Sequence, residues 1–190
     1  MAVLLLMWAG GCAASKTPRQ GLDYNQLEDA TFLAYLADEP QVSVEEAYRA
    51  MLILADGQDS GKGFEERRRI LEERGFARSA WRLRPEQVID RGSLSYMVCQ
   101  ILRYRGGIDR IILGSWGLGD RRYAHRELVH RKLLDSGSLD YQPVTGGLLV
   151  GLLARADEEM VARRLYESKG IDLGPEPPPG QPVGSPSQQR

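Results

Sequence analysis

The sequence predicts a mostly α-helical domain assembled from related helical units. Apolar residues recur at helical spacing through most of residues 23–170, capping residues precede several of these runs, and three segments resemble one another. We expect a repeat-derived bundle of about five helices with long loops, at most a minor β-hairpin, and a disordered C-terminal tail. The 190 residues, 42% of them hydrophobic and 27% charged, suffice for one domain with tails.

Apolar periodicity marks where the helices are expected. These stretches comprise residues 24–37, 43–56, 65–74, 90–105, 123–134 and 145–168, with a break near Asp157 in the last. The start at Ser43 is the best defined, because Glu46 follows three residues later in a capping-box pattern. Thr145 can cap the last helix. Gly57, Gly75 and the pair Gly106–Gly107 are expected to end helices, since glycine tolerates left-handed backbone geometry.

Two further segments lie outside this helical pattern. Residues 110–114, "RIILG", form the one plausible strand. Residues 171–190 are rich in Pro, Gly and Ser and hold almost no core-forming side chains. Such a tail cannot offset the entropy cost of ordering, so it is predicted to be disordered.

The N-terminus has the layout of a secretory signal. It reads "MAVLLLMWAGGCAASK", an apolar run too short to span a bilayer, followed by small residues and then Cys12. This pattern resembles the lipobox of bacterial lipoproteins. The resemblance implies that residues 1–11 are a signal peptide, that Cys12 is lipidated and becomes the mature N-terminus, and that residues 12–22 are an anchor and tether. Ala13, in place of an aspartate, favours the outer membrane, and the unpaired Cys99 is expected to be a buried apolar residue.

The glycine-rich stretch "ADGQDSGKG" at 55–63 is not a phosphate-binding loop. Only three residues separate Gly57 from Gly61, and Lys62 is followed by Gly63, which has no hydroxyl for magnesium. An amphipathic helix, rather than a strand, precedes it. We therefore expect a connector between two helices and no nucleotide site, and the cluster "GSWGLGD" at 114–120 also lacks dinucleotide spacing.

No other motif argues for an enzyme, a metal or a cofactor. The two histidines, His125 and His130, are five residues apart, about 140° around a helix, so they do not share a metal-facing side. Adjacent acidic pairs are interpreted as solvated helix faces. The formal net charge of −1 gives no general attraction to nucleic acid.

Charge is unevenly distributed along the chain. Residues 23–59 are strongly acidic, whereas residues 62–132 are rich in arginine. The favoured interpretation is that the acidic segment packs near the basic one or that both are solvated helix faces. The alternative is that the basic residues form a face for an anionic partner. The candidate contacts for such a partner are Arg91, Arg103, Arg105, Arg121 and Arg122, because guanidinium groups suit carboxylates and phosphates.

Internal repetition suggests a second resemblance. The segments "VSVEEAYRAMLILADG" at 42–57, "VIDRGSLSYMVCQILRYRGG" at 88–107 and "VTGGLLVGLLARADEE" at 144–159 each join a β-branched residue, a capping residue and an apolar helix. Over about 115 residues this pattern resembles the S-layer homology repeats of bacterial envelope proteins. In that family three repeats form a helical bundle that binds cell-wall polysaccharide, with an arginine in each motif. Here Arg91 in "IDRGSLSYM" matches the motif arginine.

Three functions remain open from the sequence. The first is a lipid-anchored envelope protein with a structural or interaction role, contacting the cell wall, an anionic glycan or another envelope protein at the outer membrane or the periplasmic face. The second is an envelope hydrolase that uses two facing carboxylates. The third is a cytoplasmic helical adaptor whose N-terminus is merely hydrophobic.

Overall fold

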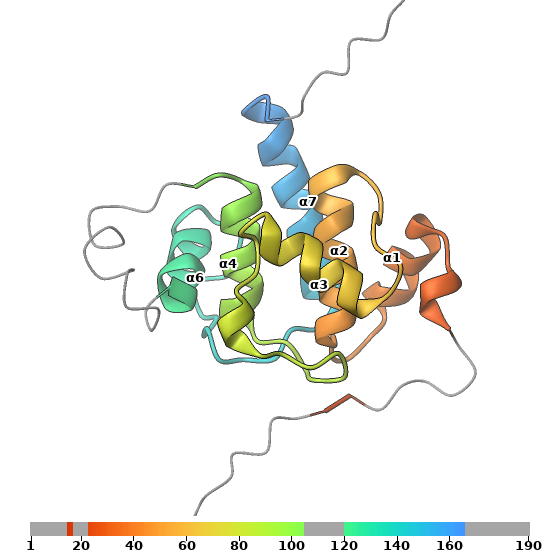
Figure 1. Ribbon diagram of the computed structural model, residues 1–190. Helices are drawn as coiled ribbons and strands as arrows, with labels where there is room; N and C mark the ends of the chain where they lie inside the picture. Colours follow the sequence, from red (N-terminus) through yellow and green to blue (C-terminus); the bar gives the residue numbers. More distant parts are fainter. Residues whose placement is uncertain (1–14, 17–22, 105–119, 166–190) are drawn as a thin grey trace, which may run out of the picture.

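The computed structural model describes residues 15–16, 23–104 and 120–165, and six α-helices lie within these ranges (Figure 1). They are α1 (Asp29–Ala37), α2 (Val44–Asp56), α3 (Phe64–Glu73), α4 (Arg91–Ile101), α6 (Asp120–His130) and α7 (Gly146–Ala162), with short 3-10 helices at Tyr24–Gln26 and Ser79–Trp81. The prediction of a mostly α-helical fold is confirmed. The expected strand at 110–114, the glycines at 106–107 and the tail at 171–190 lie outside the described residues.

Helix α2 is the centre of the bundle. It contacts α1, α3, α4 and α7, while α6 packs on α4 and α1 packs on α7. In Figure 1, α4 and α2 stand side by side in the middle of the molecule, α3 crosses in front of them, and α7 rises behind α2. Helix α2 is followed by its C-cap residue Gly57, which has φ 75° and donates its N–H to the Ile53 carbonyl, and α3 begins at Phe64. The predicted helix–loop–helix arrangement is therefore confirmed.

A closed ring of backbone hydrogen bonds joins the starts of α2, α4 and α7. The Val42 N–H donates to the Val144 carbonyl (2.9 Å), the Val144 N–H to the Ile89 carbonyl (3.1 Å), and the Ile89 N–H to the Val42 carbonyl (3.0 Å). All three side chains are fully buried in the core. The ring residues come from the three segments that resemble one another in sequence, so each segment contributes an equivalent position to the fold.

A capping residue follows each ring residue. The side chains of Ser43, Asp90 and Thr145 accept hydrogen bonds from backbone N–H groups three residues later, at 3.3, 2.6 and 3.3 Å. The capping box predicted at Ser43 is present in full, because the Glu46 carboxylate also accepts from the Ser43 backbone N–H at 2.8 Å. Each core helix therefore begins in the same way: a buried ring residue, a cap, then the helix.

Several helix ends differ from the prediction. The helix expected over 24–37 is a 3-10 turn followed by α1, and α6 starts at Asp120 rather than at residue 123. Helix α4 ends at Ile101, before the glycines expected to stop it, and α7 is unbroken at Asp157 but ends at Ala162 rather than near residue 168.

Basic residues, rather than glycines, end α4, α6 and α7. Arg103 (φ 52°), Lys132 (φ 62°) and Arg164 (φ 52°) each take the left-handed conformation just past the helix. The following residue then donates its N–H back into the last turn, as Tyr104 does to the Cys99 carbonyl at 2.9 Å. A cation at this position also interacts favourably with the negative end of the helix dipole, which partly offsets the strain of a side chain at positive φ.

The acidic and basic halves of the sequence meet inside the fold. Arg67 of α3 is fully buried and forms ion pairs with Asp59 (2.7 Å) and Glu45 (3.3 Å). Arg49, also buried, pairs with Asp29 at 2.8 Å. The interpretation that the acidic segment packs near the basic one is therefore confirmed for the ion pairs of Arg67, whereas Arg49 and Asp29 both belong to the acidic segment.

The start of α7 packs directly on the end of α1, and this contact gives a stability test. A Cβ atom at Gly146 would lie 1.6 Å from the Leu36 carbonyl oxygen, whereas one at Gly147 would lie 3.6 Å from its nearest neighbour, the Ala37 carbonyl. We expect Gly146→Ala to lower the free energy of unfolding by about 3 kcal/mol, because backbone must move. Gly147→Ala, the matched control, should change it by no more than about 1 kcal/mol. Urea denaturation of both variants measures this, and equal midpoints would contradict the packing.

Candidate functional site

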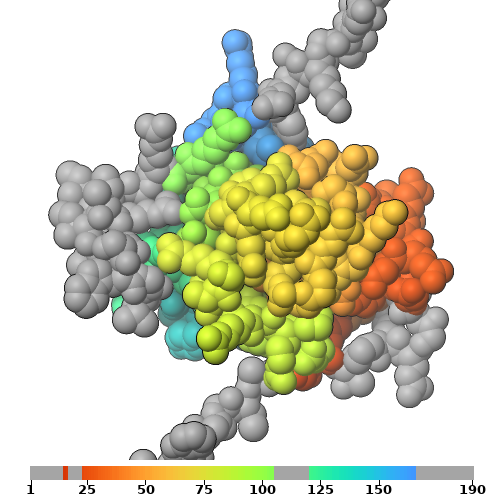
Figure 2. Space-filling model, viewed as in Figure 1, coloured from red at the N-terminus to blue at the C-terminus, as the bar shows by residue number. Residues whose placement is uncertain are grey.

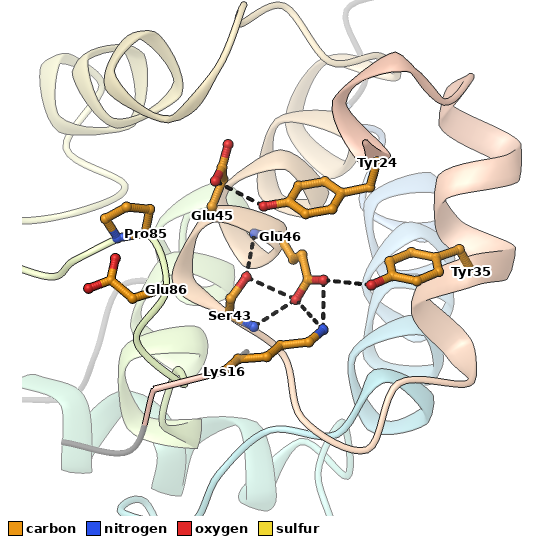
Figure 3. Close-up of a pocket in the computed structure, with 8 residues that line it drawn as sticks. All are labelled: Lys16, Tyr24, Tyr35, Ser43, Glu45, Glu46, Pro85 and Glu86. Carbon is orange, nitrogen blue, oxygen red and sulfur yellow. Dashed lines mark hydrogen bonds and ion pairs between the residues drawn. The ribbon is translucent and has the colours of Figure 1, made fainter. Parts of the chain in front are cut away.

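The N-terminal segment docks onto the helical domain through Lys16 (Figure 3). Its ammonium group lies 2.7 and 2.9 Å from the two carboxylate oxygens of Glu46 and 2.8 Å from Oε2 of Glu39. The Lys16 backbone N–H donates to the Glu86 carbonyl (2.8 Å), and Ser15 forms an isolated β-bridge with Gln87. A residue assigned from the sequence to the tether is thus held on the domain by both its backbone and its side chain.

The helix cap of α2 places the Glu46 carboxylate at the bottom of this site. Glu46 is only 1% exposed, and its oxygens accept hydrogen bonds from the Ser43 backbone and hydroxyl (2.8 and 2.9 Å) and from the Tyr35 hydroxyl (3.2 Å). Burying a carboxylate is costly unless it is paired and hydrogen-bonded. Lys16 supplies the opposite charge, so the docked segment completes the site electrostatically.

The pocket around Lys16 is small and polar. It encloses about 160 Å³ and is lined by Lys16, Tyr24, Tyr35, Ser43, Glu45, Glu46, Pro85 and Glu86. Burial first, and then the neighbouring carboxylates Glu45 and Glu46, raise the pKa of Tyr24 above the ordinary value. Burial, followed by the carboxylates Glu46 and Glu39, likewise raises the pKa of Tyr35. Both hydroxyls therefore remain donors, and the Tyr24 hydroxyl donates to Glu45 at 2.9 Å. The Lys16 ammonium is held by the carboxylates of Glu39 and Glu46, and the Tyr35 hydroxyl donates to the second of these.

The structure separates the arginines proposed as anion contacts. Arg91 opens α4, and Arg121, near the start of α6, lies beside it, with its Nη1 3.4 Å from Asp90 and its guanidinium 4.5 Å from the ring centre of Trp81. Arg122 follows at the same end of α6.

Arg103 lies past the other end of α4, about 18 Å from Arg91 along the helix axis. Arg105 and Cys12 lie outside the described residues. Three of the five arginines therefore share one end of the bundle, and Arg103 does not belong to that group.

A broad groove runs along α6 beside residues 136–141; we call it the α6 groove. It encloses about 650 Å³ and is lined by Arg122, His125, Arg126, Val129, His130, Ser136, Ser138, Leu139, Asp140 and Tyr141. At its base the buried Nε2 of His125 lies 2.6 Å from the Ser138 hydroxyl. Burial lowers the pKa of His125, which favours the neutral imidazole in this hydrogen bond.

Arg122, Arg126 and His130 are spaced four residues apart, so they project from one face of α6 into the α6 groove. His125 and His130 both line the α6 groove; His125 is buried and His130 is exposed. Among the described residues, no cluster of three or more His, Cys, Asp or Glu side chains could hold a metal ion.

Comparison with protein-family models, curated proteins and solved structures found no match. Within residues 15–16, 23–104 and 120–165, no helix is long and apolar enough to cross a bilayer.

The sequence did not point to the Lys16 site. Glu46 was recognised as a capping residue, but its charge partner is thirty residues away, and nothing local distinguishes Lys16 from other tether residues. The one available signal was the position of Glu46 on the apolar face of its helix. A carboxylate buried there needs a cation as partner.

The Lys16 contact predicts a measurable coupling. We expect Lys16→Met to lower the free energy of unfolding by about 2–4 kcal/mol, because it leaves Glu46 buried without its ion pair. Adding Glu46→Gln should recover part of that loss, since residue 46 then no longer carries a buried charge without its ion pair. Arg69→Met, which removes an exposed ion pair with Glu73, is the matched control and should change stability by less than about 1 kcal/mol. Guanidinium denaturation provides the values, and a Lys16→Met loss no larger than the control would refute the docking.

Proposed function

We propose that the protein is a lipid-anchored component of the bacterial cell envelope, attached through Cys12, with a structural or interaction role carried by its helical domain. The N-terminal pattern of apolar run, small residues and cysteine supports the anchor. The three equivalent helix starts, joined by their ring, are compatible with the resemblance to S-layer homology repeats, which act in the envelope.

The position of Lys16 is the observation that carries this proposal. Lys16 follows Cys12 by four residues, which span at most about 14 Å when fully extended. Because Lys16 is docked in the domain, a lipid on Cys12 would hold the domain close to the bilayer surface rather than at the end of a long free tether. A protein arranged in this way is suited to contact its surroundings at a fixed place in the envelope.

Interaction is favoured over hydrolysis by the same contact. The buried carboxylates of Glu39 and Glu46 converge on a single point, and a carboxylate hydrolase would need two facing carboxylates with substrate or water between them. The Lys16 ammonium occupies that point, so the pair serves to hold the N-terminal segment. The proposed partner of the domain is a cell-wall glycan or an envelope protein, with the surface arginines as contacts.

Processing at Cys12 tests the proposal. We expect the full-length protein, expressed in a bacterial host, to fractionate with membranes and to yield a mature N-terminal peptide that begins at Cys12 and carries acyl groups. Cys12→Ser should lose both the acyl mass and the membrane association. Cys99→Ser is the matched control, because Cys99 is buried in the core, and it should keep both. An uncleaved, unmodified and freely soluble wild-type protein would exclude the proposed function and leave the cytoplasmic adaptor.

A further inference from the structure

Two large apolar side chains are exposed together on the loop that follows α6. Leu139 is 45% exposed and Tyr141 is 73% exposed, and both line the α6 groove. Among the described residues the only other exposed large hydrophobic is Val161, near the far end of α7. The described surface therefore has one place where an aliphatic and an aromatic side chain both face outward.

Cations lie directly beside these apolar side chains. Arg122 and Arg126 line the same groove, both are exposed, and neither forms an ion pair with another residue in the described part of the chain. The one carboxylate of the groove, Asp140, is half-buried, and its backbone carbonyl accepts from the Gly92 N–H at 2.7 Å. The surface thus combines an apolar edge with an excess of positive charge.

This surface lies at the same end of the bundle as the docked N-terminal segment. The Arg91 N–H donates to the Gln142 carbonyl (2.9 Å), which fixes the loop beside the start of α4. The Lys16 backbone is held on the segment that leads into the same helix, at Glu86. Figure 1 shows residues 15–16 and the loop before α7 on the same side of the molecule, the lower side in this view, whereas α7 ends on the opposite side. Figure 2, from the same viewpoint, shows α7 projecting from that opposite side.

We propose that Leu139, Tyr141, Arg122 and Arg126 form a contact surface for an anionic lipid bilayer. The inference rests on the proposed function, because an anchor at Cys12 would bring this end of the domain to the headgroups. Tyrosine side chains favour the bilayer interface, a leucine beside it adds buried apolar area, and guanidinium groups attract the phosphates of anionic lipids. The surface sets the orientation of the domain on the membrane, with the end of α7 directed away from it.

A dye placed on the surface tests this orientation. In a full chain carrying Cys12→Ser, Tyr141→Cys supplies one accessible thiol for an environment-sensitive fluorophore, because Cys99 is buried. The matched control is Val161→Cys, an exposed position at the far end of α7. With vesicles of 70% phosphatidylcholine and 30% phosphatidylglycerol, we expect a blue shift from the dye at residue 141 and none from the dye at residue 161. Equal shifts at both positions, or no shift at 141, would overturn the proposal.

The charge requirement is tested in the same labelled protein. Adding Arg122→Gln and Arg126→Gln to the Tyr141→Cys chain should lower its affinity for the anionic vesicles, followed by the blue shift, about 30-fold. Vesicles of phosphatidylcholine alone should bind the unaltered Tyr141→Cys chain more weakly as well. Arg68→Gln with Arg69→Gln removes the same charge from exposed side chains on α3 and should leave the shift unchanged. A blue shift insensitive to the groove arginines would refute their role.

The contact surface and the lipid anchor at Cys12 can be refuted independently of each other. An acylated Cys12 in cells, combined with no shift at residue 141, would leave the proposed function intact and remove the contact surface. A shift at residue 141, combined with an unmodified Cys12, would keep the surface and remove the anchor.

Discussion

The fold depends on three backbone hydrogen bonds that together form a closed ring. Val42, Ile89 and Val144 each donate to one partner and accept from the other, so their buried amides are satisfied without a sheet. Because the ring is closed, it leaves no exposed strand edge at that point for another chain to pair with. Helices α2, α4 and α7 each begin directly after a ring residue and its capping residue. The ring therefore fixes the positions of the three helix starts relative to one another.

Buried charge gives the arrangement its specificity. Arg67 and Glu46 are almost completely buried. Arg67 pairs with Asp59, eight residues away, and with Glu45, 22 residues away. Glu46 pairs with Lys16, 30 residues away. Buried ion pairs are weak evidence for net stability, but an arrangement that leaves one of these charges unpaired is strongly disfavoured. The uneven charge along the sequence is therefore partly explained by pairing within the domain, while the arginines of the α6 groove remain outside it.

Local patterns in the sequence predicted local structure well. The capping box at Ser43, the cap at Thr145 and the turn at Gly57 were all predictable, because each depends on residues within one helical turn. The three related segments were also recognised, although their sequences do not reveal that they meet in a ring.

Features that depend on tertiary contacts could not be predicted in the same way. Arg103 takes positive φ where a glycine was expected, because the next residue, Tyr104, is drawn into the core between Arg131 and Arg163. The distribution of the arginines over two ends of α4 also depends on where the helix stops. The site at Lys16 needed a contact across thirty residues, for which the sequence offers no local signal.

The ring also constrains the order in which the chain can fold. Its members are about fifty residues apart in the sequence. Closing the ring therefore costs the entropy of closing long loops before the hydrogen bonds can form and offset that cost. A chain that emerges with its N-terminus first has Val42 and Ile89 available early but cannot close the ring until Val144 has emerged, after about three-quarters of the sequence. Until then α2 lacks α7, one of the helices on which it packs, and the Ile89 carbonyl before α4 lacks the Val144 N–H that donates to it.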